Sequence, residues 1–442
     1  MPRFVEALLD GERVMYAPLG GSALPAPKGC GITAPPIGEE DAAVASVELF
    51  AGAGGLALGT AAAGLGRKTV IEWDANACAT LRRNRPGWET IEGDVRGYSF
   101  NRHRGAALVS GGPPCQPFSI GGKHRGRDDR RNLFPEAVRA VREIGPEAFL
   151  FENVRGLLRE GFSTFFSYIV LQLRYPSVVA VGDEEWQDHL ARLERLHTSG
   201  EAPAYNVVWQ CVDAVDHGVP QHRWRVFLAG VRSDLGVEYA FPHATHGQDA
   251  LLHDQWVSGD YWERHEVPMR RRPAIPASWA KRVEGLRSEM RAMMGEPWRT
   301  VRDAISDLPP IAAPGEAPAM PNHYLNLGAR SYAGHTGSPL DEPAKALKAG
   351  DHGVPGGENM LRRETGEVRY FSVRECARLQ CFPDDWVFEG SWTESMRQLG
   401  NAVPVRLAEA VARPLVRLMR GGARPTRGRR PSTISGDPAG AA

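Results

Sequence analysis

The segment SGGPPCQPFSIGG, residues 110–122, holds the most distinctive candidate for chemistry in this sequence. Its cysteine, Cys115, stands among prolines and glycines, which predicts a stiff, shaped loop rather than a core position. A thiol on such a loop can act as a nucleophile once it ionises, from an unperturbed pKa of about 8.5. The apolar stretch at 106–110 predicts a strand before the loop, so Cys115 is expected at the carboxyl edge of a sheet.

Glu152 lies near the end of a second apolar stretch, EAFLFENV, residues 147–154. If both stretches form parallel strands, Glu152 and Cys115 meet at the same edge of the sheet. Apolar surroundings should raise the pKa of a carboxyl group, so Glu152 could carry a proton in a reaction. The alternative is a carboxylate that only ends the strand in a salt bridge.

Two arginines alternate in QHRWR, residues 221–225, before the apolar stretch at 224–231. The alternation places Arg223 and Arg225 on one face of a strand. Guanidinium groups suit phosphates and the exocyclic oxygen of a base, and a solvated basic strand edge is the alternative.

A glycine-rich turn, FAGAGG at 50–55, follows the apolar run at 44–50. It predicts a strand, a turn and a helix N-terminus, where backbone can approach an anionic ligand. Glu72 and Trp73 end the next predicted strand, where a carboxylate could meet ribose hydroxyls and an aromatic ring could cover an adenine. Asp94 could accept from the adenine amino group. These features alone do not separate NAD, FAD and S-adenosylmethionine, and each has a bland alternative: a packing turn, a core tryptophan and a helix N-cap.

Strand-like and helix-like segments alternate from 44 to 232, which predicts an α/β fold with a mostly parallel sheet. From about 235 to 365 tryptophans stand among Pro, Gly, His and Arg with little alternation, which predicts a second, smaller and irregular domain. Regular helix patterns return at 372–380 and 405–419.

The composition is that of a globular protein, with 42% hydrophobic and 24% charged residues. Lys+Arg and Asp+Glu both number 53, so any nucleic-acid binding must come from local patches. The start of the chain does not resemble a signal peptide, and no apolar run approaches the length of a membrane span. Six scattered cysteines without a CxxC pair predict an intracellular, reduced protein without structural zinc.

Together the motifs resemble those of the bacterial-type DNA (cytosine-5)-methyltransferases. The matching segments are FAGAGG, IEWD, GDV, GGPPCQPFS, NLF, FENV, QHRWR, RYFSVRECARLQCFPDDW and QLGNAV, in the order of the family, over 44–232 and 366–415. The resemblance implies a Rossmann-like, S-adenosylmethionine-dependent methyltransferase fold with a smaller irregular target-recognition domain.

By motif, Cys115 resembles the nucleophile that attacks C6 of cytosine, and Glu152 the glutamate that bonds N3 and the exocyclic amine. Arg223 and Arg225 resemble the pair that contacts the flipped base and the backbone near Cys115. The resemblance implies S-adenosyl-L-methionine as cofactor and no metal. The residues that match its site are Phe50, Gly52, Gly54, Gly55, Leu56, Glu72, Trp73, Asp94, Pro114, Asn132, Leu133 and Asn401.

Composition and the order of the motifs together predict the organisation of the chain. It comprises an N-terminal extension (1–43, partly disordered), a catalytic and cofactor-binding domain (44–232), a target-recognition domain (233–365), a C-terminal segment that returns to the catalytic domain (366–420) and a disordered tail (421–442). Double-stranded DNA is the implied partner of a cytoplasmic monomer without membrane contact. A cognate restriction endonuclease would be a functional rather than a physical partner.

Three alternatives stay open. A relative that methylates cytosine in tRNA would have similar motifs, although a variable region of this size favours sequence-specific DNA. A non-catalytic homologue is the second, although Cys115 and Glu152 are both present. An NAD-dependent oxidoreductase would leave the PCQ, ENV and QxRxR segments unexplained. The chain departs from the family pattern at Gly112-Pro113-Pro114 and at Cys381, where glycine is common.

Overall fold

The structure, a computed structural model, describes residues 45–114, 132–333, 335–349 and 359–421. The predicted N-terminal extension, nearly all of the predicted tail and Cys115 therefore lie outside the described residues. In the described part, no helix has both the length and the apolar character needed to cross a membrane.

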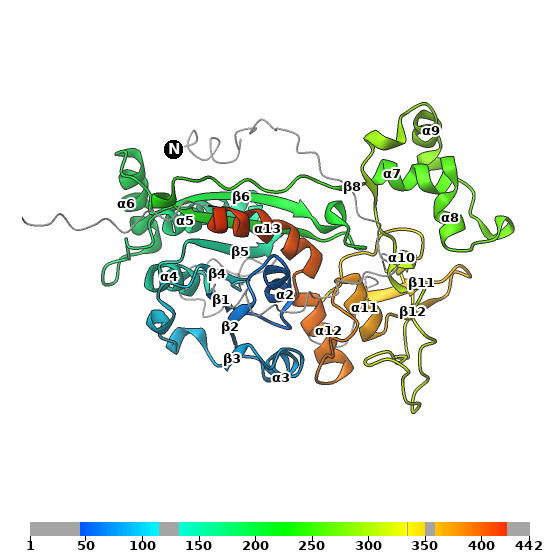
Figure 1. The fold of residues 1–442 in the computed structure, drawn as a ribbon, viewed down its shortest axis with the longest axis horizontal. Helices are drawn as coiled ribbons and strands as arrows, with labels where there is room; N and C mark the ends of the chain where they lie inside the picture. The colour runs from blue at the N-terminus through cyan, green and yellow to red at the C-terminus, as the bar shows by residue number, and fades with distance from the viewer. Residues whose placement is uncertain (1–44, 115–131, 334, 350–358, 422–442) are drawn as a thin grey trace, which may run out of the picture.

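Seven strands form the sheet of the larger lobe (Figure 1). They are β1 (Ala45–Leu49), β2 (Arg67–Glu72), β3 (Glu89–Glu92), β4 (Leu108–Gly111), β5 (Ala148–Val154), β6 (Tyr205–Asp213) and β7 (Trp224–Arg232). Their order in the sheet is β3-β2-β1-β4-β5-β7-β6. The first five strands in this order run parallel, and β7 and β6 are antiparallel to their neighbours. The predicted Rossmann-like α/β fold with a mostly parallel sheet is confirmed.

Helices cover both faces of this sheet, which explains why its strands are nearly continuous apolar runs in the sequence. The helices of the larger lobe are α2 (Gly55–Ala62), α3 (Ala75–Asn84), α4 (Phe134–Ile144), α5 (Ser163–Arg174), α6 (Trp186–Thr198), α11 (Val373–Leu379), α12 (Trp392–Asn401) and α13 (Val405–Gly421). Along β5, Leu150 packs into the core beside α2 and α13, whereas Phe149 and Phe151 pack into the core beside α4 and α5.

A smaller lobe stands apart from the sheet (Figure 1). The elements of the predicted region 233–365 are β8 (His246–Gly247), α7 (Gln248–His253), α8 (Asp260–Arg264), α9 (Ala277–Leu286), β9 (Glu296–Pro297), α10 (Val301–Ile305), β10 (Ser338–Pro339) and β11 (Met360–Arg362), with β12 (Val368–Tyr370) following. The helices α7, α8 and α9 enclose two small apolar clusters of their own, around Tyr261 and Leu286. Residues that follow, such as Val301 and Phe371, pack instead into the core of the sheet. The region thus contains a helical lobe and a segment that returns to the larger lobe.

Candidate active site

The carboxyl ends of β4 and β5 bring the start of the cysteine loop to Glu152. The strands are paired with Gly111 opposite Phe151. A Cβ built on Gly112 would lie 3.1 Å from Glu152 Oε2, and Asn153 Nδ2 donates to the Pro113 carbonyl at 2.8 Å. The loop that leads to Cys115 therefore begins against Glu152, as the sequence predicted, although Cys115 itself lies outside the described residues.

Glu152 is paired with Arg225. Arg225 Nε lies 2.6 Å from Glu152 Oε1, and both side chains are largely buried, with 13% and 9% of their surface exposed for Arg225 and Glu152. Burial raises the pKa of Glu152, while the positive charges of Arg225 and Arg223 oppose that rise. A largely buried carboxyl group with a raised pKa and a fixed orientation can hold a proton for a bound substrate.

Arg223 is placed differently from Arg225. It is 1% exposed, and its guanidinium donates to the backbone carbonyls of Leu347 at 2.9 Å, Ala402 at 2.9 Å and Gly400. Three carbonyls from two distant segments thus occupy its terminal nitrogens. The sequence analysis assigned both arginines to contacts with the flipped base and the backbone near Cys115. In the structure Arg225 is paired with Glu152, whereas Arg223 binds the carbonyls of Gly400 and Ala402 in the C-terminal segment.

The glycine-rich turn contains two kinds of glycine. Gly52 has a left-handed φ of 53°, and a Cβ built on it would meet no atom within 4 Å. Gly54 also has a left-handed φ, of 87°, and a Cβ on Gly55 would lie 2.2 Å from the Val403 carbonyl oxygen. Gly55 therefore permits close packing of the C-terminal segment, and Leu56 is buried in the core. Gly52 is the glycine that leaves open space for a ligand.

Glu72 fastens this turn to the end of β2. Its carboxylate accepts hydrogen bonds from the backbone N–H groups of Gly52 at 2.7 Å and of Trp73 and Asp74 at 2.9 Å. Burial raises the pKa of Glu72, and these three donors oppose the rise. Trp73 beside it is 77% exposed, so its ring is available to stack on a flat ligand.

The other predicted cofactor residues lie on three further segments. Asp94 accepts from Arg96 N at 3.0 Å and pairs with the Arg96 side chain, which is the N-cap arrangement that the sequence left as an alternative. The Leu133 N–H donates to the Pro114 carbonyl at 3.1 Å, and Asn132 Oδ1 accepts from the first residue of α4 at 3.3 Å. Asn401 is exposed at the end of α12, two residues before Val403 reaches the glycine turn.

The sequence analysis missed two positioning residues. Asn153 holds the cysteine loop through Pro113, and Gln221 is fully buried between Leu347 N at 2.8 Å and the Leu379 carbonyl at 3.2 Å. Asn153 belongs to the FENV segment and Gln221 to the QHRWR segment, so their positions within these motifs could have indicated a role for them.

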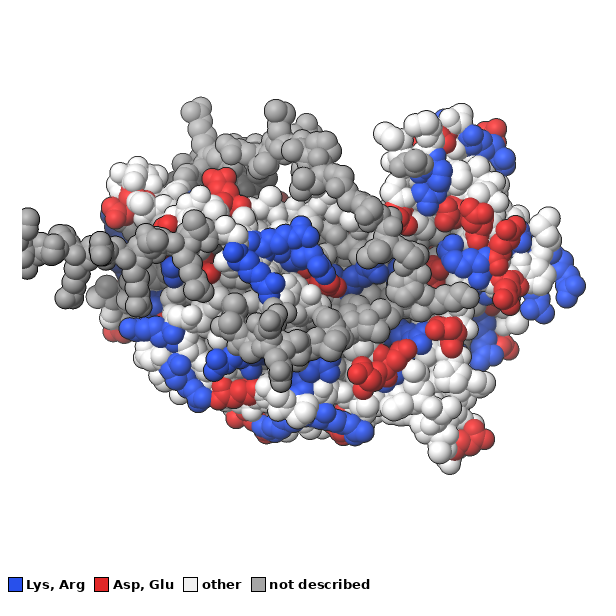
Figure 2. All heavy atoms as spheres, in the orientation of Figure 1, with Lys and Arg blue, Asp and Glu red and all other residues white. Residues whose placement is uncertain are grey.

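Charge is distributed unevenly over the surface, although the net charge of the chain is zero. Figure 2 shows lysines and arginines gathered across the middle of one face, over α13, and both signs mixed over the smaller lobe. Arg413 and Arg417 are among the exposed residues of α13. A patch of this kind attracts polyanions.

Known proteins show clear similarity to this chain. The sequence model of a family described as C-5 cytosine-specific DNA methylase matches residues 44–175 and 183–417. The type II methyltransferase M.Eco47II of Escherichia coli is 33% identical over 380 residues, which cover 84% of this chain and 79% of the relative. The type II methyltransferase M.NgoMIV of Neisseria gonorrhoeae is 32% identical over 378 residues, with coverage of 85% and 98%.

The fold also has a counterpart among solved structures. A crystal structure of a DNA modification methyltransferase encoded within an E. coli prophage has a TM-score of 0.53 and 22% sequence identity, and the alignment covers 86% of this chain and 100% of that one. This likeness concerns the fold.

Proposed function

The chain belongs to the C-5 cytosine-specific DNA methylase family and is a DNA (cytosine-5)-methyltransferase, and on this premise we propose that it methylates cytosine within a specific double-stranded DNA sequence. We infer that it is the modification enzyme of a restriction–modification system, because relatives such as M.Eco47II and M.NgoMIV carry the name type II methyltransferase. The observation that carries the proposal is the Glu152–Arg225 pair beside the start of the cysteine loop.

S-adenosylmethionine is the methyl donor that the family and the fold imply. The residues at the glycine turn fit it, because Gly52 leaves open space and Trp73 presents an exposed ring next to Glu72. Glu72 would orient the turn and meet the ribose, and Trp73 would stack on the adenine. When bound, the cofactor supplies an electrophilic methyl group.

The side chains of this protein then account for the activation of cytosine. Cytosine C5 is a poor nucleophile, so we propose that the Cys115 thiolate adds to C6 while Glu152 shares a proton at N3. Arg225 holds Glu152 in place and limits its conformations. C5 of the resulting enamine takes the methyl group. Solvent water then accepts the C5 proton as the C6–S bond breaks, and the Cys115 thiolate leaves, which restores the aromatic ring of the product. The base must leave the stack to reach these groups, at a cost of a few kcal/mol.

Recognition of neighbouring bases is assigned to region 233–365. Cys115, Glu152 and Arg225 act on the flipped cytosine, so they do not read flanking base pairs. Arg270 and Arg271 are exposed on the smaller lobe, and arginine paired with guanine is the favoured contact in the major groove. Exchange of this region with that of a relative of different specificity should transfer the methylated site.

The test of the function is covalent trapping. A duplex with 5-fluorocytosine at the target should give a denaturation-resistant complex that requires S-adenosylmethionine, because fluorine cannot leave as a cation. Bisulfite sequencing of DNA from a host that expresses the protein supplies the target sequence. The Cys115→Ser variant should bind duplex and cofactor but give neither adduct nor methylation, since a hydroxyl ionises far less readily than a thiol.

Two results would overturn parts of the proposal. An enzyme that methylates the normal duplex but never forms the adduct would remove the covalent role of Cys115. Methylation of tRNA instead of duplex DNA under the same conditions would replace the substrate.

A further inference from the structure

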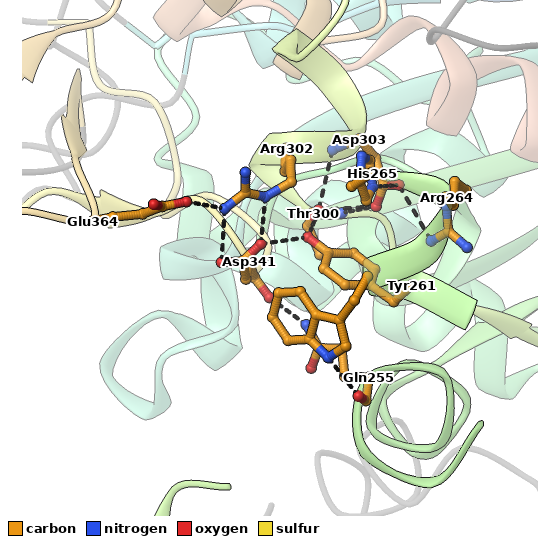
Figure 3. A network of polar contacts seen from close by, with 10 residues as sticks. Gln255, Tyr261, Arg264, His265, Thr300, Arg302, Asp303, Asp341 and Glu364 are labelled. Carbon is orange, nitrogen blue, oxygen red and sulfur yellow. Dashed lines mark hydrogen bonds and ion pairs between the residues drawn. The ribbon is translucent and has the colours of Figure 1, made fainter. Parts of the chain in front are cut away.

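The residues from Asp341 to Leu347, which we name the bridging segment, lie between the smaller lobe and the QHRWR segment. At its first residue, Tyr261 Oη donates to Asp341 Oδ1 at 2.8 Å, and Arg302 contacts both carboxylate oxygens, at 2.6 and 3.1 Å (Figure 3). Gln255 Nε2 donates to the Asp341 backbone carbonyl at 2.7 Å. Asp341 thus contacts three elements: α8, the helical segment Asp254–Ser258 before it, and the returning helix α10.

These contacts are sheltered from water. Tyr261 is fully buried, Gln255 is 3% exposed, and Trp262 Nε1 donates to the Gln255 carbonyl. Burial raises the pKa of Tyr261, so its hydroxyl stays a donor to Asp341. A buried network of this kind has few competing water contacts and holds one geometry.

Three residues further on, the same segment is bonded to the catalytic edge. Ala344 N donates to the Pro220 carbonyl at 3.0 Å, and the Ala344 carbonyl accepts from His222 N at 2.9 Å. Leu347 N donates to Gln221 Oε1 at 2.8 Å. Backbone and side-chain bonds therefore attach the bridging segment to residues 220–223.

The attachment continues to both halves of the proposed site. Arg223 donates to the Leu347 carbonyl and to the carbonyls of Gly400 and Ala402, next to the glycine turn. Two residues along the chain, Arg225 is paired with Glu152. The link from Asp341 to Glu152 is thus a series of buried and partly buried bonds over a short stretch of chain.

We propose that Asp341 is a positioning residue for methyl transfer: through the bridging segment it holds the lobe of α7–α9 in register with the catalytic edge, so that reading of the flanking bases and placement of cytosine at Glu152 occur together. The inference rests on the proposed function. Loss of the Asp341 charge would leave Arg302 held by Glu364, at 2.7 Å, and would loosen Tyr261, which would let the lobe shift against the edge.

A matched residue separates positioning from simple stability. Asp303 lies in the same network and accepts from Thr300 N at 2.8 Å and His265 Nε2 at 2.8 Å, but none of its described bonds reaches the bridging segment (Figure 3). Its removal should therefore loosen the contact between α8 and the returning helix α10 but leave the bonds between the bridging segment and the edge in place. A second contact between lobe and edge, Trp298 Nε1 to Asp216 at 3.0 Å, also bypasses the bridging segment.

The experiment compares Asp341→Asn and Arg302→Gln with Asp303→Asn in the full chain. The readouts are kcat and KM on the target duplex, methylation of duplexes with one flanking base pair changed, the Kd for S-adenosylmethionine, and the unfolding midpoint. For the first two variants we expect KM for the target duplex to rise by about tenfold. The preference for the target duplex over duplexes with one changed flanking base pair should fall by about tenfold, because one base contact contributes discrimination on this scale. The Kd for the cofactor should stay within about twofold, a free-energy difference of about 0.4 kcal/mol, because Asp341 is not part of the proposed cofactor site. Asp341→Glu, which restores the charge, should recover part of the preference.

The outcomes separate the two levels of the proposal. If Asp341→Asn and Arg302→Gln lower the unfolding midpoint but keep the wild-type preference, Asp341 is structural only. Asp341 is likewise structural only if Asp303→Asn loses the preference equally. A wild-type protein that methylates no DNA contradicts the proposed function instead. If Asp341→Asn does not fold, Arg302→Gln alone decides, because it removes the same ion pair from the other side.

Discussion

The edge of the seven-stranded sheet and the lobe of α7–α9 hold their polar residues by different means. At the edge, Glu72 and Glu152 lie near the ends of strands of one sheet, and strand register places them. In the lobe, position depends on side chains far apart in sequence, such as Tyr261 with Asp341, 80 residues on, and His265 with Asp303, 38 residues on. Motifs at the edge are therefore compact in sequence, while those of the lobe are dispersed.

The two regions also differ in their apolar support. The sheet is packed on both faces by extensive cores, whereas the lobe has two clusters centred on a few residues such as Trp262 and Val283. A small core contributes little stability, so the lobe relies more on its polar ties. Removal of single polar groups, at the edge of the sheet or in the network of the lobe, tests this comparison.

The largest effect is expected for Arg223→Met. The change removes the donor to the buried carbonyls of Leu347 and Gly400, and it leaves the Ala402 carbonyl with a longer bond from Gln380 Nε2, at 3.3 Å. We expect the free energy of unfolding to fall by about 3–5 kcal/mol, since each buried unsatisfied group costs about 1–3 kcal/mol. Urea unfolding followed by circular dichroism measures this.

Arg225→Met is the matched variant, because it removes one ion pair and leaves a carboxyl group that can take up a proton. Its loss of stability should be smaller than that of Arg223→Met, and its main effect should be on turnover. Equal losses of stability in the two variants would contradict the division of roles between the arginines.

The second effect concerns rate rather than stability. Glu152→Gln should lower kcat by about 100-fold, equivalent to about 2.7 kcal/mol, because the amide cannot exchange a proton. Stopped-time assays of methyl transfer to the target duplex measure it. Glu160→Gln, on an exposed turn close in sequence, is the control and should keep the wild-type rate. A Glu152→Gln rate within threefold of wild type would reduce Glu152 to a structural role.

The sequence predicted most of the edge because strand alternation and glycine turns are local signals. It predicted the α/β sheet, and it placed Glu152 at the edge where Cys115 is expected; the structure brings the residues just before Cys115 to that edge. It assigned one role to Arg223 and Arg225 because alternation reports a shared face but not which atoms lie above it. The carbonyls that occupy Arg223 come from 347, 400 and 402, and no local pattern links them to it.

Other polar contacts were also missed because they join residues from separate segments of the sequence. Lys68 lies in the strand that Glu72 ends, and its Nζ donates to Thr60 Oγ1 at 2.6 Å and Ser46 Oγ at 3.1 Å inside the core. The network around Asp341 joins residues from four separated segments. Such contacts follow from tertiary packing, which periodicity does not encode.

The third prediction uses pH to separate the two regions. Burial opposes ionisation of Asp303, but hydrogen bonds from His265 and Thr300 and the charge of Arg264 outweigh it and hold its pKa at about 2. Because folding lowers this pKa, its stabilisation is present above about pH 4 and is lost as the pH falls towards 2. Burial raises the pKa of Glu48, in strand β1 of the sheet, to about 7 despite Lys68. Its contribution to stability is therefore present at low pH and lost as the pH rises through 7.

Asp303→Asn should therefore lower the free energy of unfolding by about 2 kcal/mol at pH 7, and by progressively less below about pH 4. Tryptophan fluorescence during urea unfolding at several pH values measures the difference. Glu284→Gln, from an exposed pair with Arg287, is the control and should change stability by less than about 1 kcal/mol. A difference for Asp303→Asn that does not depend on pH would mean that the ionised carboxylate is not what stabilises the lobe.

The smallest effect tests whether backbone conformation governs the region around the sheet. After α11, the Phe382 N–H donates to the Ala377 carbonyl and the Cys381 N–H to the Arg378 carbonyl, both at 2.9 Å, and Cys381 has a left-handed φ of 58°. This is the Schellman arrangement, in which glycine normally takes the left-handed position. It gives a physical reason for the glycine that is common here in the family.

Cys381→Gly removes a strain of about 1 kcal/mol that Cys381→Ala retains, while both lose the buried thiol. We therefore expect the glycine variant to be more stable than the alanine variant by about 1 kcal/mol. Cys376, equally buried but inside α11, is the control, and there alanine should be better than glycine by about 1 kcal/mol. Urea midpoints of the four variants measure both differences. If alanine is the better residue at both positions, the left-handed turn costs nothing measurable, and side-chain packing, not backbone conformation, governs stability around the sheet.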